Sequence, residues 1–404
     1  MKKIILLSVL TSSALLATNG DLMLSHGAKS TGMGGVAIAV AHGAESAYAN
    51  PAMLKDVKSS EFDASLTLFM PDVKFQNDMN PTYTSEKSDA DKSFLPELSY
   101  VHRNSDNVVW GVALGGTAGM GVDQVGKNSG GFSMKTELQV AKLGIPVAYT
   151  TGALTVAVEP VLQYSTLQIN YQTAKGASAN PKSSSTGFGV NIGTAYEVGD
   201  LTVGALYQSK IEADYKDNIS SAMRDFGVAT VTSGDRLDQP AEAGIGFGYK
   251  LGNSTFGVDA KRVQWSKAKG YKEFGWEDQN IYSIGYQYKV PAWAIRAGYN
   301  HAKSPVKELN GAATSPANYP NAAINFFNLA GFPAVVETHY TLGGDYAITE
   351  NLDLSLAVVY SPEKTEKFDT SMMSAAMTQN KVTSSSAEVK HSQKAVTLGI
   401  SYRY

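Results

Sequence analysis

Three histidines, each with a hydroxyl residue nearby, are the side chains of this sequence that could form a hydrolytic site. They are His102, His301 and His339, and the hydroxyl residues near them are Ser99, Ser304 and Thr341. A hydrolase with a serine or threonine nucleophile activates the hydroxyl group through a hydrogen bond to the imidazole of a neighbouring histidine. Strands are rich in Ser and Thr, however, so such neighbours arise by chance, and histidines at a membrane interface account for them better. We therefore predict no catalytic residue and no enzymatic activity.

A second motif could bind a dinucleotide. Gly32, Gly34 and Ala37 fit the G-x-G-x-x-A fingerprint, and Asp56 follows at about the spacing of a ribose-binding acid. The fingerprint works where it joins a strand to a helix. No strong strand pattern precedes Gly32, and Pro51 interrupts the place of the second strand. We therefore expect no nucleotide and no other cofactor.

Composition excludes further classes of function. The 404 residues contain no Cys and six scattered His, which predicts neither disulfides nor a metal site. The net charge is −3 and no basic block occurs, so nucleic acid is not an expected partner. Gly and aromatic residues are frequent while charged residues make up only 18% of the chain, a mixture that suits curved β-structure.

The N-terminus has the pattern of a cleaved secretory signal peptide, residues 1–17. Lys2 and Lys3 precede an apolar run that extends to Leu16, and Ala17 offers a small residue for cleavage. Later segments contain no run of about 18–20 apolar residues of the kind that a membrane helix needs. A mature chain that sits in a membrane must then cross it as a β-barrel.

Alternation of apolar and polar residues with a period of two dominates residues 61–404. A soluble sandwich alternates too, but here short turns and long loops follow one another strictly, as in outer-membrane barrels. Tyr402 and Tyr404 end the last alternating segment, and an aromatic ending resembles the signal that barrel-assembly machinery recognises. Fourteen strands are expected near residues 61–70, 95–103, 107–119, 133–149, 153–172, 185–198, 200–213, 240–251, 254–266, 278–289, 292–303, 336–349, 351–361 and 392–404.

Residues 18–58 differ from the rest of the mature chain. They are rich in Gly and Ala, lack alternation, and are too few to form a core of their own. We expect this segment to pack inside the barrel as a plug, or hatch, with residues 59–404 forming the barrel.

Charged residues on the polar faces of the strands are expected to point into the lumen and to pair there. They are Glu159, Glu242, Asp259, Lys261, Arg296, Asp345 and Arg403. Two long outer loops carry apolar residues, which either pack together or form a hydrophobic groove for an oily ligand. These groove candidates are Met223, Phe226, Phe326, Phe327, Leu329 and Phe332.

Several ordered motifs resemble the FadL family of hydrophobic-compound transporters along almost the whole mature chain. The stretch GAKSTGMGGVAIAVAHGAESAYANPAML looks like the family's plug segment, which ends in the signature Asn50, Pro51 and Ala52. PELSYVHR, GFGVNIGTAYEVGDLTVGALYQSKI, IRAGYNHAKSPV and HYTLGGDYAITENLDLSLAVVYSP then follow the family's strand pattern in order.

The resemblance implies an all-β fold: a 14-stranded antiparallel transmembrane β-barrel with the hatch in its lumen. Family members release ligand sideways where the third strand kinks inward. The matching residues here are Gly115, Gly116, Thr117, Ala118 and Gly119, and glycine makes such a kink inexpensive. Expected partners are a hydrophobic small molecule, outer-membrane lipid and lipopolysaccharide, and the assembly machinery, with a monomer in the outer membrane of a Gram-negative bacterium.

One departure leaves the ligand open. Fatty-acid-transporting members carry basic residues near the outer part of strand five, where this chain has Gln168, Asn170 and Gln172, with Lys175 as the nearest cation. Neutral aromatic or alkane hydrocarbons are therefore an alternative to long-chain fatty acids. An alternative of another class is a structural or adhesive surface barrel without transport.

Overall fold

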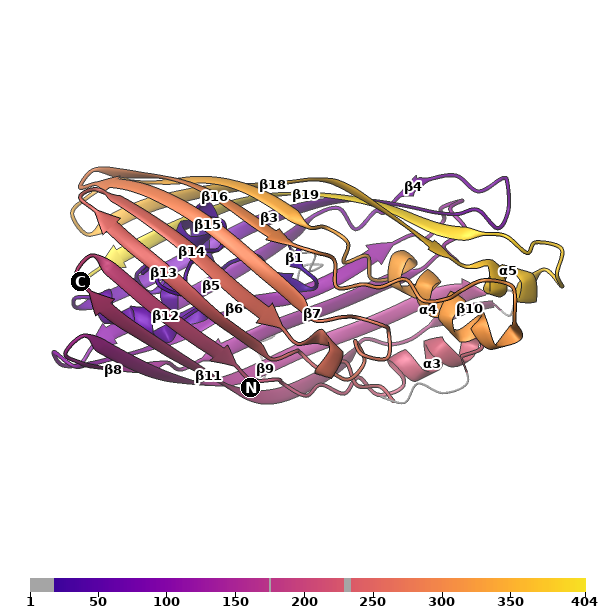
Figure 1. Cartoon of the computed structure of the whole chain (residues 1–404), viewed down its shortest axis with the longest axis horizontal. Coiled ribbons are helices and arrows are strands. Elements are labelled where there is room, and N and C mark those ends of the chain that lie inside the picture. The colour runs from indigo at the N-terminus through magenta and orange to yellow at the C-terminus, as the bar shows by residue number, and fades with distance from the viewer. Residues whose placement is uncertain (1–17, 174–175, 229–233) are drawn as a thin grey trace.

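The computed structural model describes residues 18–173, 176–228 and 234–404, and within them the chain forms a closed antiparallel barrel (Figure 1). The predicted signal peptide, residues 1–17, and Lys175 lie outside the described residues. Fourteen strands form the wall when β7 and β8 are taken as one interrupted strand. They are β3 (Ser60–Asn77), β5 (Ser93–Arg103), β6 (Val108–Asp123), β7 (Lys135–Gly144) with β8 (Val147–Thr151), β9 (Leu154–Thr173), β11 (Ser183–Val198), β12 (Leu201–Gln208), β13 (Glu242–Leu251), β14 (Ser254–Val263), β15 (Gln279–Val290), β16 (Trp293–Ala302), β17 (Thr338–Ala347), β18 (Leu352–Asp369) and β19 (Ser386–Arg403).

Each wall strand pairs with its neighbour in sequence, and β19 closes the ring on β3 from Arg403↔Glu61 to Ala387↔Asn77. The barrel fold and its fourteen strands, expected from the alternation, are confirmed. The fourth strand is interrupted at Ile145 and Pro146, between β7 and β8, because proline cannot donate to a ladder.

Three predicted strands, residues 61–70, 351–361 and 392–404, are longer in the structure than expected. Residues 71–77 continue β3, and β18 and β19 stay paired as far as Asp369↔Ser386, past a bulge between Ser361 and Lys364. Beyond the apolar zone these strands consist mostly of polar residues, so the sequence alone predicts a loop there. The wall therefore extends beyond the predicted strand ends at β3, β18 and β19 (Figure 1).

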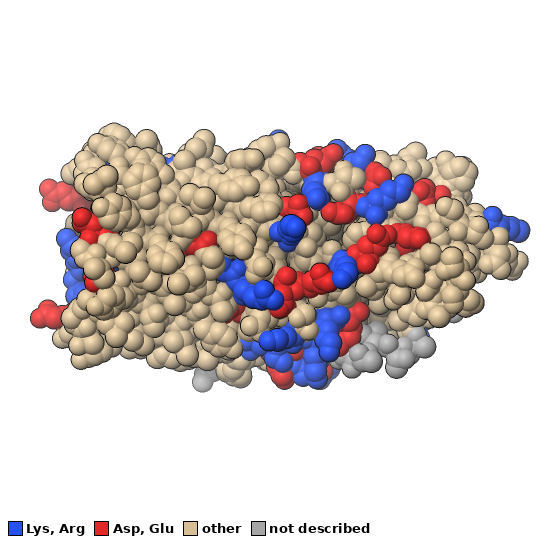
Figure 2. Space-filling model, in the orientation of Figure 1, with Lys and Arg blue, Asp and Glu red and all other residues tan. Residues whose placement is uncertain are grey.

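The outer surface is divided into zones. Toward the end with the short turns, large apolar side chains such as Phe247, Ile284 and Leu342 face outward with about half of their surface exposed. Figure 2 shows that this zone carries few charged residues and that a charged band separates it from the long-loop end. An apolar belt bounded by charge is the surface of a protein that sits in a bilayer.

Helices occupy the long-loop end and the lumen. At the long-loop end lie α3 (Asn218–Asp225), α4 (Tyr319–Ala330) and α5 (Ser371–Met377), together with the short turns η4 (Trp265–Lys267) and η5 (Pro316–Asn318) and the short strands β4 (Glu86–Lys87) and β10 (Gly176–Ala179). None of the described helices has the length and the apolar character that a helical membrane span requires.

Residues 18–58, the hatch segment, lie inside the barrel (Figure 1). They form β1 (Thr18–Asn19), β2 (Leu22–Met23), α2 (Gly27–Gly32), η2 (Glu45–Tyr48) and η3 (Pro51–Asp56). The approach to the wall is close: a Cβ on Gly298 of β16 would lie 2.1 Å from the Gly34 nitrogen. Gly34 itself has φ +71°, so glycines on both sides make this contact possible.

Candidate transport path

The wall is irregular where β6 passes Gly116. The β5–β6 ladder ends at Glu97↔Gly115, and the register between β6 and β7 shifts between Gly116 and Ala118, so that Thr117 is the bulged residue. Pro96 follows the last pair on the β5 side and has no N–H to continue it. The five predicted kink residues thus include a real bulge at the point where β6 separates from β5.

Past the bulge, the hatch segment is the new partner of β6. Leu22 of β2 pairs with Ala118, and the Gly119 amide donates to the Asp21 carbonyl at 2.9 Å. The hatch also holds the end of β5, because His26 Nδ1 lies 2.6 Å from a carboxylate oxygen of Glu97. A strand that leaves the wall and pairs with the plug can satisfy its backbone without closing the wall.

An apolar pocket of about 10 Å³, here the outer pocket, lies beneath α4 at the long-loop end. Its lining contains no charged side chain. The lining residues are Met120, Leu167, Ile169, Ile219, Leu237, Tyr271, Phe274, Trp276, Phe327, Asn328 and Phe332. A closed pocket of this composition suits a hydrophobic ligand, which would have to displace side chains to enter.

A second cavity of about 20 Å³, here the kink pocket, lies between β3 and β6. Phe69 and Val73 line it from β3, and Gly119 and Met120 line it from β6. Met120 also lines the outer pocket, so its side chain stands between the two spaces. Methionine is flexible enough to move aside, which makes Met120 the nearest barrier between the outer pocket and the β6 bulge.

The hatch N-terminus is tied to the loops above the outer pocket. Asp21 accepts hydrogen bonds from Gln239 Nε2 at 3.1 Å and from the hydroxyl of Tyr271, which lines the outer pocket. Gly20 packs directly against the Trp265 ring, where a Cβ would meet Cζ2 at 2.5 Å. The same aromatic cluster therefore contacts both the expected ligand space and the segment that pairs with β6.

Burial raises the pKa of the Asp21 carboxyl to about 6, although hydrogen bonds from Tyr271 and Gln239 partly oppose the rise. The pKa of Asp21 is higher when the N-terminus of the hatch is bound to β6 and the loops than when it is detached, so binding is accompanied by uptake of a proton. The bound state of the hatch N-terminus is therefore destabilised as the pH rises from about 4 through 6. We expect the Gly119 amide to gain about tenfold in protection when the pH falls from 7 to 5. Hydrogen exchange, corrected for the intrinsic rate, measures this, and D21N should abolish the change; an unaltered response in D21N would contradict the assignment to Asp21.

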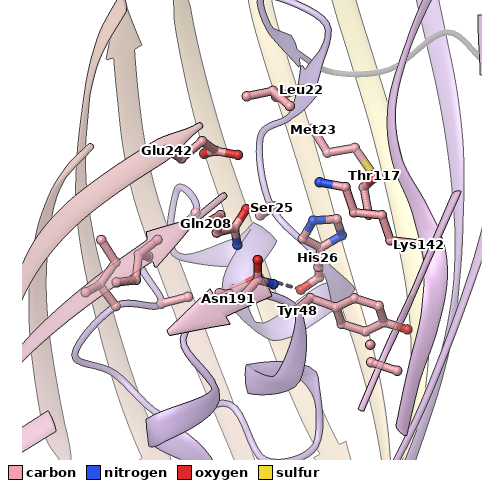
Figure 3. A pocket seen from close by; sticks show the side chains of 18 of the residues that line it. Leu22, Met23, Ser25, His26, Tyr48, Thr117, Lys142, Asn191, Gln208 and Glu242 are labelled. Atoms are coloured by element: carbon pink, nitrogen blue, oxygen red, sulfur yellow. Dashed lines mark hydrogen bonds between the residues drawn. The ribbon is translucent and has the colours of Figure 1, made fainter. Parts of the chain in front are cut away.

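A third cavity, here the inner chamber, has a volume of about 70 Å³ and lies deeper in the lumen (Figure 3). The hatch residues Leu22–His26 form one side, and wall strands from β6 to β14 form the other. Its polar lining includes His26, Lys142, Glu159, Asn191, Gln208, Glu242 and Lys261. The inner chamber and the outer pocket have no lining residue in common.

The six predicted groove residues come together, but they do not form an open groove. All six side chains are at most 7% exposed: Met223 in α3, Phe226 directly after it, Phe326, Phe327 and Leu329 in α4, and Phe332 after α4. Rings of Phe226 and Phe326 lie 6.0 Å apart, because α3 and α4 turn their apolar faces toward each other over the barrel. Of the six, Phe327 and Phe332 line the outer pocket.

The histidines have other partners than the predicted hydroxyls. His102 Nδ1 lies 2.8 Å from Ser60 Oγ, His301 Nδ1 lies 3.1 Å from Thr338 Oγ1, and His339 Nε2 lies 3.3 Å from Gln393 Oε1. Among the described residues, no group of three or more His, Asp or Glu is placed to hold a metal ion.

The glycines of the nucleotide-like fingerprint serve packing instead. Gly32 lies against the wall at Gly343 Cα, where a Cβ would approach to 3.0 Å, and Gly34 lies against the backbone of Tyr299. The fingerprint thus marks the place where the hatch touches β16 and β17.

The Asn50-Pro51-Ala52 signature fixes the end of the hatch. Asn50 caps η3 through a hydrogen bond from the Ala52 amide, and its Nδ2 donates to the carbonyls of Ile38 and Thr194, at 2.7 and 3.1 Å. Asn50 therefore joins two parts of the hatch to β11, and Pro51 stands at the first helical position, which it favours.

The prediction that lumen charges face inward and pair is confirmed for most of them. Arg296 binds Asp345 through two bonds of 2.6 Å, and Lys261 lies 3.5 Å from Glu242. Asp259 instead accepts the hatch amides of Ala37 and Ile38, at 2.8 and 3.0 Å. The remaining two pair outside the predicted set, Glu159 with Asn191 and Arg403 with Asp353.

Sequence reasoning missed the residues that connect the cavities: Asp21, Met120, Lys142, Tyr271 and Trp276. The run Trp265 to Trp276, rich in aromatic residues within a loop, is the signal that could have found two of them. Asp21, Met120 and Lys142 carry no such signal, because their partners are far away in sequence.

The chain resembles known proteins in both sequence and fold. A family model described as "Outer membrane protein transport protein (OMPP1/FadL/TodX)" matches residues 10–318. The long-chain fatty acid transport protein of Escherichia coli O6:H1 (strain CFT073) is 23% identical over 327 residues, which are 66% of this chain and 73% of that protein.

Solved structures share the architecture at lower identity. A Pseudomonas aeruginosa FadL homologue superposes with a TM-score of 0.68 at 14% identity, over 95% of this chain and 99% of the other. The toluene transporter TodX of P. putida gives 0.67 at 18% identity, over 94% and 99%. The toluene transporter TbuX of Ralstonia pickettii gives 0.64 at 16% identity, over the same shares.

Proposed function

Because the chain belongs to the FadL/TodX family of outer-membrane transport proteins, we propose that it moves small hydrophobic molecules inward through the outer pocket and sideways past the bulge of β6. The ligand enters among the aromatic side chains under α4, passes Met120, and leaves the barrel where β6 has separated from β5. Transport runs down the concentration gradient and needs no cofactor.

The end of the β5–β6 ladder at Gly115 is the observation that carries this proposal. A sealed structural or adhesive barrel has no reason to break the pairing of two wall strands in the apolar belt, since unpaired backbone in lipid is costly. The part of β6 beyond Gly115 pairs instead with the hatch segment inside the barrel. The hatch thus stabilises the separation of β6 from β5.

Two ligand classes compete, and the outer pocket favours one of them. The relatives include a fatty acid transporter and two toluene transporters. The lining of the outer pocket contains one side-chain amide, Asn328, and no charged group. A neutral aromatic or aliphatic hydrocarbon therefore fits the outer pocket as well as the chain of a fatty acid does.

Filling the space beside the bulge should block the exit. A Cβ on Gly116 would meet the Leu95 side chain at 3.4 Å and nothing nearer, so G116V adds bulk toward β5 without a backbone clash. We expect uptake of toluene and of a long-chain fatty acid into whole cells to fall about tenfold or more, with assembly retained.

The control must be a glycine on the inner face of the wall that has space for a side chain. Gly399 meets this condition, because a Cβ added there would lie 3.4–3.7 Å from the nearest side-chain carbons. G399V should leave uptake within about twofold of wild type. Gly298 is unsuitable, because a side chain there would strike the hatch. Normal uptake of every probe by assembled G116V would refute the lateral route.

A further inference from the structure

A row of tyrosines marks the long-loop edge of the apolar belt on one side of the barrel. Tyr299 of β16 lies opposite Tyr340 of β17, and Tyr340 lies opposite Tyr360 of β18. All three face outward, with between 38% and 52% of their surface exposed. Aromatic residues of outer-membrane barrels form girdles at the membrane–water interface, so this row indicates the level at which lipid head groups begin.

Two lysines without ion-pair partners continue the same row. Lys394 of β19 lies opposite Tyr360 on one side and opposite Met70 of β3 on the other. Lys92 follows at the next position, because the residue after it begins the ladder of β5 with β3. Both lysines are exposed, and neither forms an ion pair with a described residue. The outer wall at β5, β3 and β19 therefore carries free positive charge at the level of the lipid head groups.

A second row of lysines lies farther from the apolar belt. Lys87 of β4 lies opposite Lys74 of β3, and Lys74 lies opposite Lys390 of β19. Like charges placed directly opposite each other repel. Each of these lysines has one acid within 3.2–3.4 Å, and these acids are Asp91, Glu363 and Glu388. The second row is thus close to neutral, and the uncompensated cations are the two beside the belt.

An acceptor lies between the two rows. Asp72 of β3 stands opposite Ser392 of β19, and its Oδ1 is buried without a hydrogen-bond partner among the described residues. A carboxylate accepts hydrogen bonds and donates none, so this side chain needs a donor and repels a bare anion. The surface as a whole offers cations to an anionic group and one acceptor to a hydroxyl group.

We propose that Lys92 and Lys394 bind the two phosphate groups of the diphosphorylated glycolipid of the outer leaflet, lipid A, and that a sugar hydroxyl of the same molecule donates to Asp72 once this side chain turns outward. The two lysines are two strand spacings apart, about 10 Å. Their long, flexible side chains extend from the wall and let the ammonium groups adjust to the separation of the phosphates.

The apolar belt below the lysines provides the surface for the acyl chains. Phe94, two residues after Lys92, and Leu398, four residues after Lys394, face outward with 49% and 53% of their surface exposed. The binding surface lies on the outside of the wall, away from the three cavities, so the proposal does not depend on the transport path.

The number of phosphates sets the selectivity. A lipid with one phosphate can form a charge-assisted hydrogen bond with only one of the two lysines at a time. We therefore expect diphosphoryl lipid A to bind more tightly than monophosphoryl lipid A or phosphatidylglycerol.

The test is native mass spectrometry of the full-length protein in detergent, titrated with one lipid at a time. Wild type should bind one molecule of diphosphoryl lipid A at least about tenfold more tightly than either lipid with a single phosphate. K92Q/K394Q should lose about tenfold in affinity for diphosphoryl lipid A, and K92R/K394R should bind it within about twofold of wild type, because arginine keeps the charge and also binds phosphate.

The matched control is K216Q/K381Q, which removes the same charge from two exposed lysines of the outer loops; it should bind like wild type. Equal affinity of K92Q/K394Q and wild type for diphosphoryl lipid A would overturn the proposal. Equal loss in K216Q/K381Q and K92Q/K394Q would overturn it as well, because only net charge would then matter. If K92Q/K394Q does not assemble, wild type decides alone: phosphatidylglycerol bound as tightly as diphosphoryl lipid A would refute a site for the glycolipid.

Discussion

Deleting residues 18–52 is expected to convert the protein into an open pore. The deletion removes β1, β2, α2 and η2, which fill the lumen, while the ladder from β3 around to β19 remains complete. Asp259, Arg296 and Asp345 would then face water instead of the hatch. A fourteen-stranded wall without a plug leaves an aqueous channel, so conductance in planar bilayers should rise by about an order of magnitude or more.

The control for this experiment is the double mutant D259A/N50A, which keeps the hatch but removes hydrogen bonds to Ala37, Ile38 and Thr194. It should show brief openings and not a steady open state, because the remaining contacts still hold the segment. Conductance of the deleted protein at the wild-type level would mean that the hatch segment does not close the lumen.

The barrel could be predicted from the sequence because the same pattern of alternating strand and loop recurs along the chain. Each strand alternates with a period of two, and each rim has loops of one length class, so fourteen weak patterns support one another. The strand ends on the long-loop side were harder to predict from the sequence. There β18 continues past the bulge with polar residues on both faces, so no alternation marks residues 362–367 as strand. In β19 only Ala387 and Val389 carry the alternation of residues 386–391, which is too little to be recognised without the partner strand.

The position of the bulge in β6 could be predicted from the sequence, but the direction in which the strand bends could not. The run from Gly115 to Gly119 shows that the strand can bend, whereas the inward direction depends on Leu22 and Asp21, which lie almost a hundred residues earlier. Similarly, the apolar residues of the two outer loops were visible as a set, yet their burial follows from α3 meeting α4 across the barrel mouth. Contacts of this kind arise from closure of the ring, which no local pattern encodes.

Replacing Arg296 with Met should destabilise the folded protein by about 3–5 kcal/mol, because it leaves the buried Asp345 carboxylate without its partner. Both side chains are nearly inaccessible, at 2% and 5% exposed, and two hydrogen bonds of 2.6 Å join them. Arg296 also donates to Gln287 at 2.8 Å and packs against Gly32, so the hatch should loosen along with the wall.

The pair formed by Arg403 and Asp353 provides the comparison. Its shortest bond is also 2.6 Å, but the Arg403 side chain is 36% exposed at the short-turn rim, where water screens the charges. R403M should therefore cost no more than about 1 kcal/mol, and R296M/D345L should regain much of the stability lost in R296M, because it removes the stranded charge. Urea unfolding in detergent, followed by tryptophan fluorescence, measures all three variants. Equal losses for R296M and R403M would show that the enclosed position of the Arg296–Asp345 pair contributes nothing to holding the hatch and the wall together.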